Sequence, residues 1–188
     1  MSAPELESLR MVGVEDGSFE AFQRDRLQLS LLCAVKMLDA SIQEVLLRNI
    51  EVDGRDATEK LLDMLGVTGC DVIILGGVSF AGFNVIDAVR VHEVIRVPVI
   101  VFSGEKPDSE SVREALRIHF VDWDERWAPI AVLGEVYSAV TMESEPPVYF
   151  EVVGTSPEWA ETVLRHSAKL CRVPEPVRVA GMIAKGLT

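Results

Sequence analysis

Two adjacent carboxylates, Glu15 and Asp16, are the first residues of this sequence whose type and spacing suit metal chemistry. They end a short apolar run, residues 11–17, in the stretch GVEDGSF. Carboxylate oxygens suit Mg²⁺ and Mn²⁺, and a pair of such ions can hold both the attacking and the leaving oxygen of a phosphodiester. An acid followed by glycine is also a common turn, so a solvated turn after a strand explains the same residues.

A second pair of acids, Asp53 and Asp56, lies in EVDGRDATE, between a predicted strand and a predicted helix. A further metal carboxylate would be supplied at this place in the fold. Each acid also has a structural explanation, because Asp53 with Gly54 makes a good turn and Asp56 suits the N-cap of the helix.

The loop of residues 76–84 contains a third group of candidates. It follows a buried strand at residues 71–75 and precedes a helix predicted to start near Asn84, which is where α/β proteins place their sites. Its glycines permit close backbone approach, and the helix N-terminus favours an anion. Phe80 and Phe83 would either pack the loop or stack on a base. The candidate substrate-binding residues are Gly77, Ser79, Phe80, Gly82, Phe83 and Asn84.

Known phosphate and nucleophile motifs do not match this loop. It lacks the Gly-Lys-Ser/Thr of a P-loop and the dinucleotide fingerprint, and it misses the esterase elbow G-x-S-x-G by one residue. Ser79 would act as a nucleophile only beside a base, and nothing in the sequence places His92, His119 or His166 there. Lys106, just after the apolar run VPVIVF at the same predicted sheet edge, would contact a phosphate or remain solvated.

Apolar periodicity predicts an α/β fold with a mixed, ribonuclease H-like sheet. Three sequential antiparallel strands are expected in residues 11–17, 26–38 and 41–52, after which the pattern changes to helix. The order is then β-β-β-α-β-α-β, with two right-handed crossovers and a mixed C-terminal extension. A doubly wound nucleotide-binding fold would alternate strand and helix from the start. We expect one domain, with its core in about residues 8–120 and the extension in about 121–188.

Composition indicates a soluble globular protein of a reducing compartment. The three cysteines are far apart, and residues 1–10 lack the cationic start and apolar run of a signal peptide, so we expect a cytoplasmic protein without membrane segments. The net charge of -12 opposes long-range attraction to nucleic acid, which divalent metal and a local basic strip would have to offset. An exposed edge strand or the Trp-bearing extension would support a homodimer.

Several segments resemble an archaeal protein family of unknown function that is related to endonuclease V. They are GVEDGSF (13–19), VDGRDATE (52–59), DVIILGGVSFAGFNVID (71–87), PVIVF (98–102) with KP (106–107), and VPEPVRVA (173–180), so the resemblance covers most of the chain. The GFN block is the most specific. The resemblance implies a ribonuclease H-like fold and a nuclease that cuts DNA or RNA near deaminated purines, with Mg²⁺ or Mn²⁺ as cofactor.

The resemblance also implies roles for particular residues. Glu15 or Asp16 matches the first catalytic acid, and Lys106 approximates the lysine that follows the fifth strand. The carboxylate that the endonuclease V pattern carries after the fourth strand falls at Gly76, and loss of a bridging ligand weakens or abolishes a two-metal mechanism. The carboxylates that would bind metal are Glu15, Asp16, Asp53, Asp56 and, as an imperfect substitute at residue 76, Asp87.

Two functions of different classes follow. The first is a metal-dependent phosphodiesterase on nucleic acid, with convergent acids binding metal and with the glycine loop and Lys106 holding phosphate. The second is a non-catalytic module that binds a nucleotide, nucleic acid or protein through residues 76–84, with a formed pocket and no convergent acids. Gly76 and the acidic composition favour the second function, whereas Glu15, Asp16 and Lys106 favour the first. We therefore expect an endonuclease V-like protein whose activity is weakened or lost at Gly76.

Overall fold

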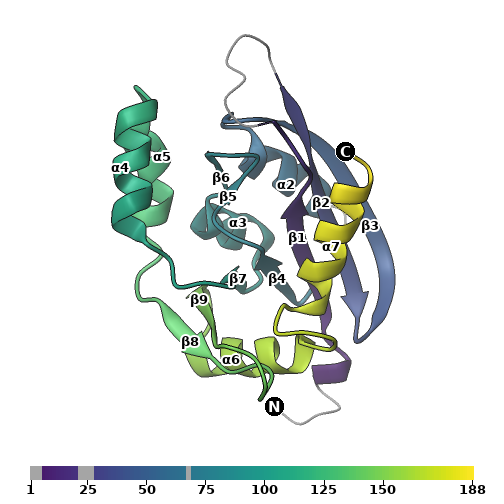
Figure 1. The fold of residues 1–188 in the computed structure, drawn as a ribbon. Coiled ribbons are helices and arrows are strands. Elements are labelled where there is room, and N and C mark those ends of the chain that lie inside the picture. Colours follow the sequence, from purple (N-terminus) through teal and green to yellow (C-terminus); the bar gives the residue numbers. More distant parts are fainter. Residues whose placement is uncertain (1–5, 21–27, 67–68) are drawn as a thin grey trace.

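A seven-stranded mixed sheet forms the centre of the computed structural model, which describes residues 6–20, 28–66 and 69–188 (Figure 1). β1 (Arg10–Asp16), β2 (Leu29–Leu38) and β3 (Ser41–Glu51) pair antiparallel. On the other side of β1, β4 (Val72–Leu75) and β7 (Val99–Ser103) continue the sheet in parallel. The order β3-β2-β1-β4-β7 confirms the predicted ribonuclease H-like connectivity.

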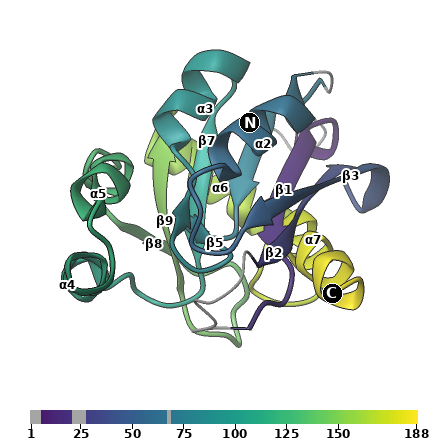
Figure 2. The same cartoon turned by 90° about the horizontal axis from the view of Figure 1, so that it is seen from above.

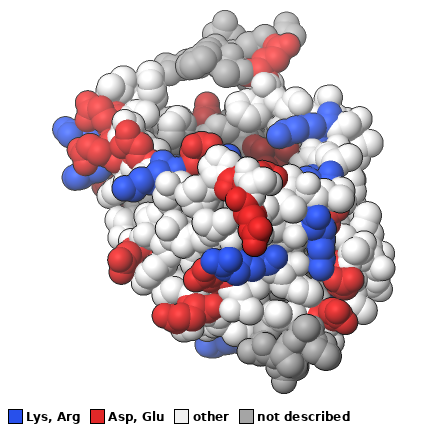
Figure 3. All heavy atoms as spheres, turned by 60° about the horizontal axis from the view of Figure 1, so that its bottom comes forward, with Lys and Arg blue, Asp and Glu red and all other residues white. Residues whose placement is uncertain are grey.

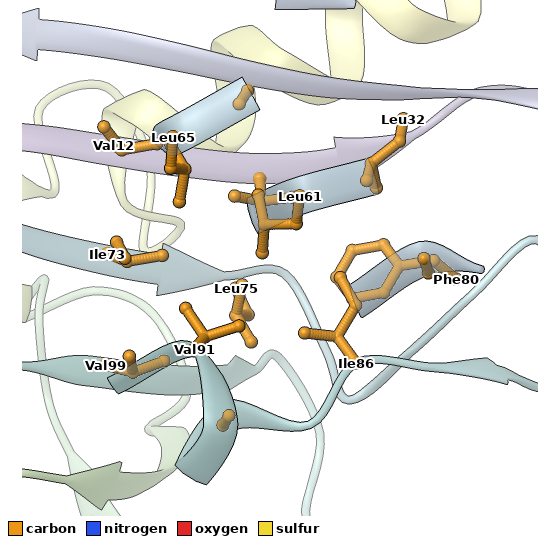
Figure 4. Close-up of a cluster of buried hydrophobic side chains, with 14 of the residues drawn as sticks. Val12, Leu32, Leu61, Leu65, Ile73, Leu75, Phe80, Ile86, Val91 and Val99 are labelled. Carbon is orange, nitrogen blue, oxygen red and sulfur yellow. The ribbon is translucent and has the colours of Figure 1, made fainter. Parts of the chain in front are cut away.

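Helices cover both faces of this sheet (Figure 2). α2 (Ala57–Leu65) and α3 (Ala88–Ile95) pack on one face, against buried β-branched and leucine side chains of the central strands. The cluster drawn in Figure 4 includes Leu61 and Leu65 of α2, Val91 of α3, and the sheet residues Val12, Ile73, Leu75 and Val99. This packing makes β1 and β4 rigid supports for the residues at their carboxyl ends.

The segment after residue 121 contributes to the same sheet. β9 (Val148–Val153) pairs antiparallel with β7, and β8 (Tyr137–Ala139) forms the edge beyond it. α6 (Pro157–Ser167) and α7 (Glu175–Gly186) cover the second face. In the part of the chain described, every helix is too short or too polar to cross a membrane.

A pair of helices, α4 (Ser109–His119) and α5 (Trp123–Ala131), lies to one side of the sheet in both views (Figures 1 and 2). α5 contains Pro129. Cation–π contacts join the two helices, with Arg117 5.6 Å from the Trp123 ring centroid. This pair reaches the site through Arg126, which is described below.

α7 packs directly on β1. A Cβ atom at Gly13 would lie 2.1 Å from the carbonyl carbon of Pro176 and 2.3 Å from the Val177 amide nitrogen, so the helix backbone touches the strand where glycine stands. The two elements therefore approach more closely than any side chain at residue 13 would allow.

Gly13→Ala is expected to lower the free energy of unfolding by about 3 kcal/mol, because backbone atoms on both sides cannot yield to the methyl group. Urea denaturation measures the change. Gly186→Ala is the matched control, since nothing lies within 4 Å of a Cβ placed there. A Gly13→Ala protein as stable as the wild type would contradict the contact between α7 and β1.

Candidate active site

Glu15 and Asp16 are the last residues of β1, at the middle of the sheet. β4 runs parallel to β1 with Leu75 opposite Val14, so Gly76 lies beside Glu15. The Gly76 amide donates a hydrogen bond to the Val14 carbonyl at 2.9 Å. The end of the first strand and the start of the glycine loop therefore meet at one edge.

The side chain of Glu15 occupies space left by two glycines. A Cβ atom at Gly76 would lie 2.3 Å from Glu15 Oε1, and one at Gly181 of α7 would lie 3.6 Å from Glu15 Cγ. The endonuclease V pattern has a carboxylate at the position of Gly76, and this chain places the Glu15 carboxyl in the space beside that backbone.

Glu15 has a strongly shifted proton affinity. Burial raises its pKa to about 7, because desolvation disfavours the charged form. The Asp16 amide, 3.2 Å from Glu15 Oε2, opposes this shift, the Asp16 carboxylate adds to it, and the positive charge of Lys185 lowers the pKa. Acids shifted in this way gather at functional sites more often than elsewhere.

Protein stability is expected to fall as pH rises from about 5 to 8. The folded state keeps a proton on Glu15 up to about pH 7, whereas the unfolded chain releases it near the ordinary value of 4.5. The free energy of unfolding falls by about 2 kcal/mol. This is less than the full pKa shift would give, because the side chain is part-buried and solvent screens some of the effect. Urea denaturation at both pH values measures it. An equal pH dependence in Glu15→Gln would show that another group is responsible.

Asp16 holds a small hairpin over this edge. β5 (Ser79–Phe80) and β6 (Asn84–Val85) pair antiparallel, and the turn between them includes Ala81 and Gly82 with φ of 44° and 87°. Asp16 Oδ2 accepts a hydrogen bond from the Ala81 amide. The first-strand acid and the Ser79 loop therefore share one rim of the molecule.

Asp53 binds the same hairpin through its backbone and its side chain. Its amide donates to the Ala81 carbonyl at 2.8 Å, and its Oδ1 accepts from the Phe83 amide at 2.9 Å. A Cβ atom at Gly82 would lie 2.2 Å from Asp53 Oδ1, so this contact requires glycine. Asp53 is thus at the predicted edge, with one carboxylate oxygen engaged by the hairpin.

Asp56 and Asn84 form a buried polar link at the start of α2. Asn84 Nδ2 donates to Asp56 Oδ1 at 2.7 Å and to the Glu51 carbonyl at 2.9 Å. Asn84 Oδ1 accepts from the Ala57 amide at 3.0 Å. Asp56 is at the N-cap position, as predicted, but the prediction that its side chain caps the helix is wrong. Asn84, fully buried, bonds the first amide of α2 in its place.

Asp87 has a structural role at the start of α3. Its Oδ1 accepts from the Arg90 amide at 2.9 Å, and its own amide donates to Thr58 Oγ1 at 3.0 Å. The prediction of a helix from Asn84 is wrong, because residues 84–85 pair within the hairpin and α3 begins at Ala88. Within the described chain, no hydrogen bond joins Asp87 to Glu15 or Asp16.

The loop residues expected to bind substrate divide into buried and exposed ones. Phe80 is 1% exposed and belongs to the core in Figure 4, so it cannot stack on a base in this conformation. Phe83 packs edge-on against Phe120 with ring centroids 5.4 Å apart. Asn84 is committed to α2, whereas Ser79 is exposed on the hairpin.

Lys106 lies in an exposed loop beyond β7, and among the described residues no ion pair joins it to Glu15 or Asp16. Two of the three histidines considered as a base for Ser79 lie beside other groups. His92 Nδ1 lies 2.8 Å from the Val97 carbonyl, and His166 lies 3.7 Å from Asp39, at the turn between β2 and β3.

Arg126 of α5 is a structural residue that the sequence argument missed. Its Nη1 donates to the carbonyls of Gly54 at 2.8 Å and Phe83 at 2.9 Å, so it ties the two loops at the rim together. Its Nε donates to Asp122 at 3.1 Å, and its guanidinium lies 4.3 Å from the Phe120 ring centroid. The i,i+4 spacing of Asp122 and Arg126 was the available signal.

The acids form a pair and not a larger cluster. Among residues 6–20, 28–66 and 69–188, no group of three or more His, Cys, Asp or Glu side chains is placed to hold a metal ion. Glu15 and Asp16 offer adjacent hard oxygen ligands. Such a pair suits one Mg²⁺ or Mn²⁺ ion that keeps several waters and gains ligands from a substrate phosphate. It does not supply the ligands of a two-ion centre.

The sheet order β3-β2-β1-β4-β7 is that of a ribonuclease H-like fold, and comparison with known proteins agrees. Endonuclease V from Ciona intestinalis, solved in complex with a DNA containing inosine, superimposes with a TM-score of 0.60. The match has 13% identity and covers 94% of this chain and 84% of that one, so it supports the fold. A protein of unknown function from Archaeoglobus fulgidus superimposes with a TM-score of 0.83, at 27% identity over 95% of this chain and 98% of that one.

This chain belongs to the endonuclease dU family, whose model matches residues 7–188. A relative described as a UPF0215 protein, from Methanothermobacter thermautotrophicus, is 34% identical over 184 residues, which are 96% of this chain and 88% of the relative. The predicted relation to an archaeal, endonuclease V-like family is therefore confirmed.

Proposed function

We propose that this protein hydrolyses phosphodiester bonds of nucleic acid beside a deaminated base, with deoxyuridine in DNA as the preferred site. The observation that carries the proposal is the placement of Glu15 and Asp16 at the carboxyl end of β1, beneath a hairpin held by Asp16. The family description, endonuclease dU, supports the choice of base. The inosine-containing DNA bound by the Ciona relative supports a nucleic-acid substrate.

In this proposal, Glu15 and Asp16 hold one Mg²⁺ or Mn²⁺ ion. When bound, the ion would supply Lewis-acid stabilisation of charge on a phosphate oxygen. Glu15, with its pKa near 7, would be held ionised by the positive charge. Asp16 also fixes the hairpin through the Ala81 amide, which orients the exposed Ser79 side of the loop toward the substrate.

The test is cleavage of end-labelled oligonucleotides that contain one uracil or one inosine, in DNA and RNA, beside unmodified sequences. Reactions with Mg²⁺, with Mn²⁺ and with EDTA are run for the wild type and for Asp16→Ala. We expect metal-dependent cutting near uracil in DNA, and none with the variant. Cutting that persists unchanged in EDTA or in Asp16→Ala would remove the proposed site.

A non-catalytic binding role is the second candidate, because only two carboxylates converge. It predicts that uracil-containing DNA binds to the wild type and is never cut. A pocket of about 390 Å³ is formed between β8 and α6, lined in part by Tyr137, Phe150 and Glu158. That pocket is on other elements than the loop of residues 76–84, so the loop would bind through its exposed surface.

A further inference from the structure

α7 lies along β1, and its last turn lies beside the candidate site. Its first turn touches Gly13 through Pro176, and Gly181 accommodates the Glu15 side chain. At its end, Thr188 Oγ1 accepts a hydrogen bond from the Ser18 amide at 2.9 Å and donates to the Ala184 carbonyl at 3.0 Å. These contacts fix the C-terminal turn of α7 beside the residues that follow the acid pair.

Lys185 is in this turn. It follows Gly181 by four residues and therefore lies on the same side of the helix, above the glycine that contacts Glu15. The positive charge of Lys185 lowers the pKa of Glu15, which opposes the increase caused by burial. Lys185 is exposed, and among the described residues no carboxylate lies within 4.0 Å of its ammonium group.

We propose that Lys185 binds the phosphate of the nucleic acid that lies against the Glu15–Asp16 pair. The inference rests on the proposed function and adds a phosphate-binding residue to it. Two carboxylates repel a phosphodiester, so a lysine at the same edge, in addition to the metal ion, favours the approach of the phosphate. On the face drawn in Figure 3, Lys and Arg side chains lie scattered among acidic ones, and the net charge of the chain is -12.

Lys185 and Lys106, the lysine that the resemblance favours, differ in how firmly the backbone around them is held. Lys185 belongs to a helix that is fixed to β1 by the contacts of Gly13, Gly181 and Thr188. Lys106 lies in an exposed loop after β7. A lysine on a rigid element loses less conformational freedom when it binds a phosphate. The charge of Lys185 is also already close enough to Glu15 to lower its pKa.

The experiment measures the salt dependence of DNA binding. Fluorescence anisotropy measures the affinity for a labelled, uracil-containing duplex in EDTA, at about 50 to 200 mM NaCl. Lys185→Gln is compared with Lys106→Gln and Lys169→Gln, which remove the same charge. Lys169 pairs with Asp39 at 2.8 Å. Asp39 follows Leu38, which pairs with Arg10 at the opposite end of β1 from Asp16.

We expect Lys185→Gln to lower affinity about 5- to 10-fold at low salt and to reduce the slope of log K against log[NaCl] by about 0.9, the value of one phosphate contact. Lys185→Arg keeps the charge and should keep the slope. Lys169→Gln should match the wild type. A wild-type slope in Lys185→Gln, or an equal loss in Lys169→Gln, would overturn the assignment.

The outcomes also separate this inference from the proposed function. If the wild type cuts uracil-containing DNA and Lys185→Gln keeps the full slope, the hydrolase stands and the role of Lys185 is rejected. If the slope falls but no variant or condition gives cutting, Lys185 is a phosphate ligand of a non-catalytic binder. If the wild type binds no nucleic acid in EDTA and cuts none with Mg²⁺ or Mn²⁺, both proposals fail.

Discussion

Replacing Asp16 with alanine is expected to reduce cleavage of uracil-containing DNA by about 10³-fold or more, the effect typical of losing a charge that stabilises the reacting centre. Asp16 supplies half of the acid pair at the end of β1 and also accepts the hydrogen bond from the Ala81 amide. The alanine variant therefore loses a metal-binding oxygen and releases the hairpin above it. Initial rates at saturating Mg²⁺ measure the change.

Asp16→Asn separates these two losses. The asparagine keeps an oxygen that accepts from Ala81 but carries no charge. We expect cleavage by Asp16→Asn to be nearly as low as by Asp16→Ala, while its melting temperature stays close to that of the wild type. Near-normal cleavage by the asparagine variant would mean that Asp16 acts through the hairpin and not through its charge.

Replacing Gly76 with alanine is expected to reduce cleavage by about 10²-fold while changing the free energy of unfolding by less than about 1 kcal/mol. The added methyl group would lie 2.3 Å from Glu15 Oε1. The obstacle is the end of a flexible side chain, so the chain yields by moving the Glu15 carboxyl rather than by unfolding. A displaced carboxyl no longer pairs with Asp16.

Gly104→Ala is the matched control, since the nearest atom to a Cβ there is Arg172 Nη2 at 3.7 Å, an ordinary contact. It should leave both cleavage and stability unchanged. A stronger test moves the carboxyl from one strand to the other. We expect the double variant E15A/G76D to cleave faster than E15A, because the aspartate would enter the space that Glu15 leaves. A double variant no better than E15A would argue against the shared position.

Much of the architecture was readable from the sequence because it depends on local patterns. Apolar alternation in residues 29–51 and the buried run of β4 predict strands wherever they pack, and Ser156 with Pro157 predicts the start of α6. The acid pair at the end of β1 and the glycine loop after β4 were predicted to meet because parallel strands share one edge. The resemblance to an endonuclease V-related family rested on the same segments.

The order of the strands β1, β2, β3, β4 and β7 and the location of Glu15 and Asp16 therefore follow from local sequence patterns. Three contacts depend on the packing of distant elements: the Glu15 carboxyl lies in the space beside Gly76, Asn84 bonds the first amide of α2, and α7 brings Lys185 near Glu15. Each of these contacts joins residues at least 27 positions apart. Such contacts depend on how closely whole elements pack, and neither periodicity nor propensity records that distance.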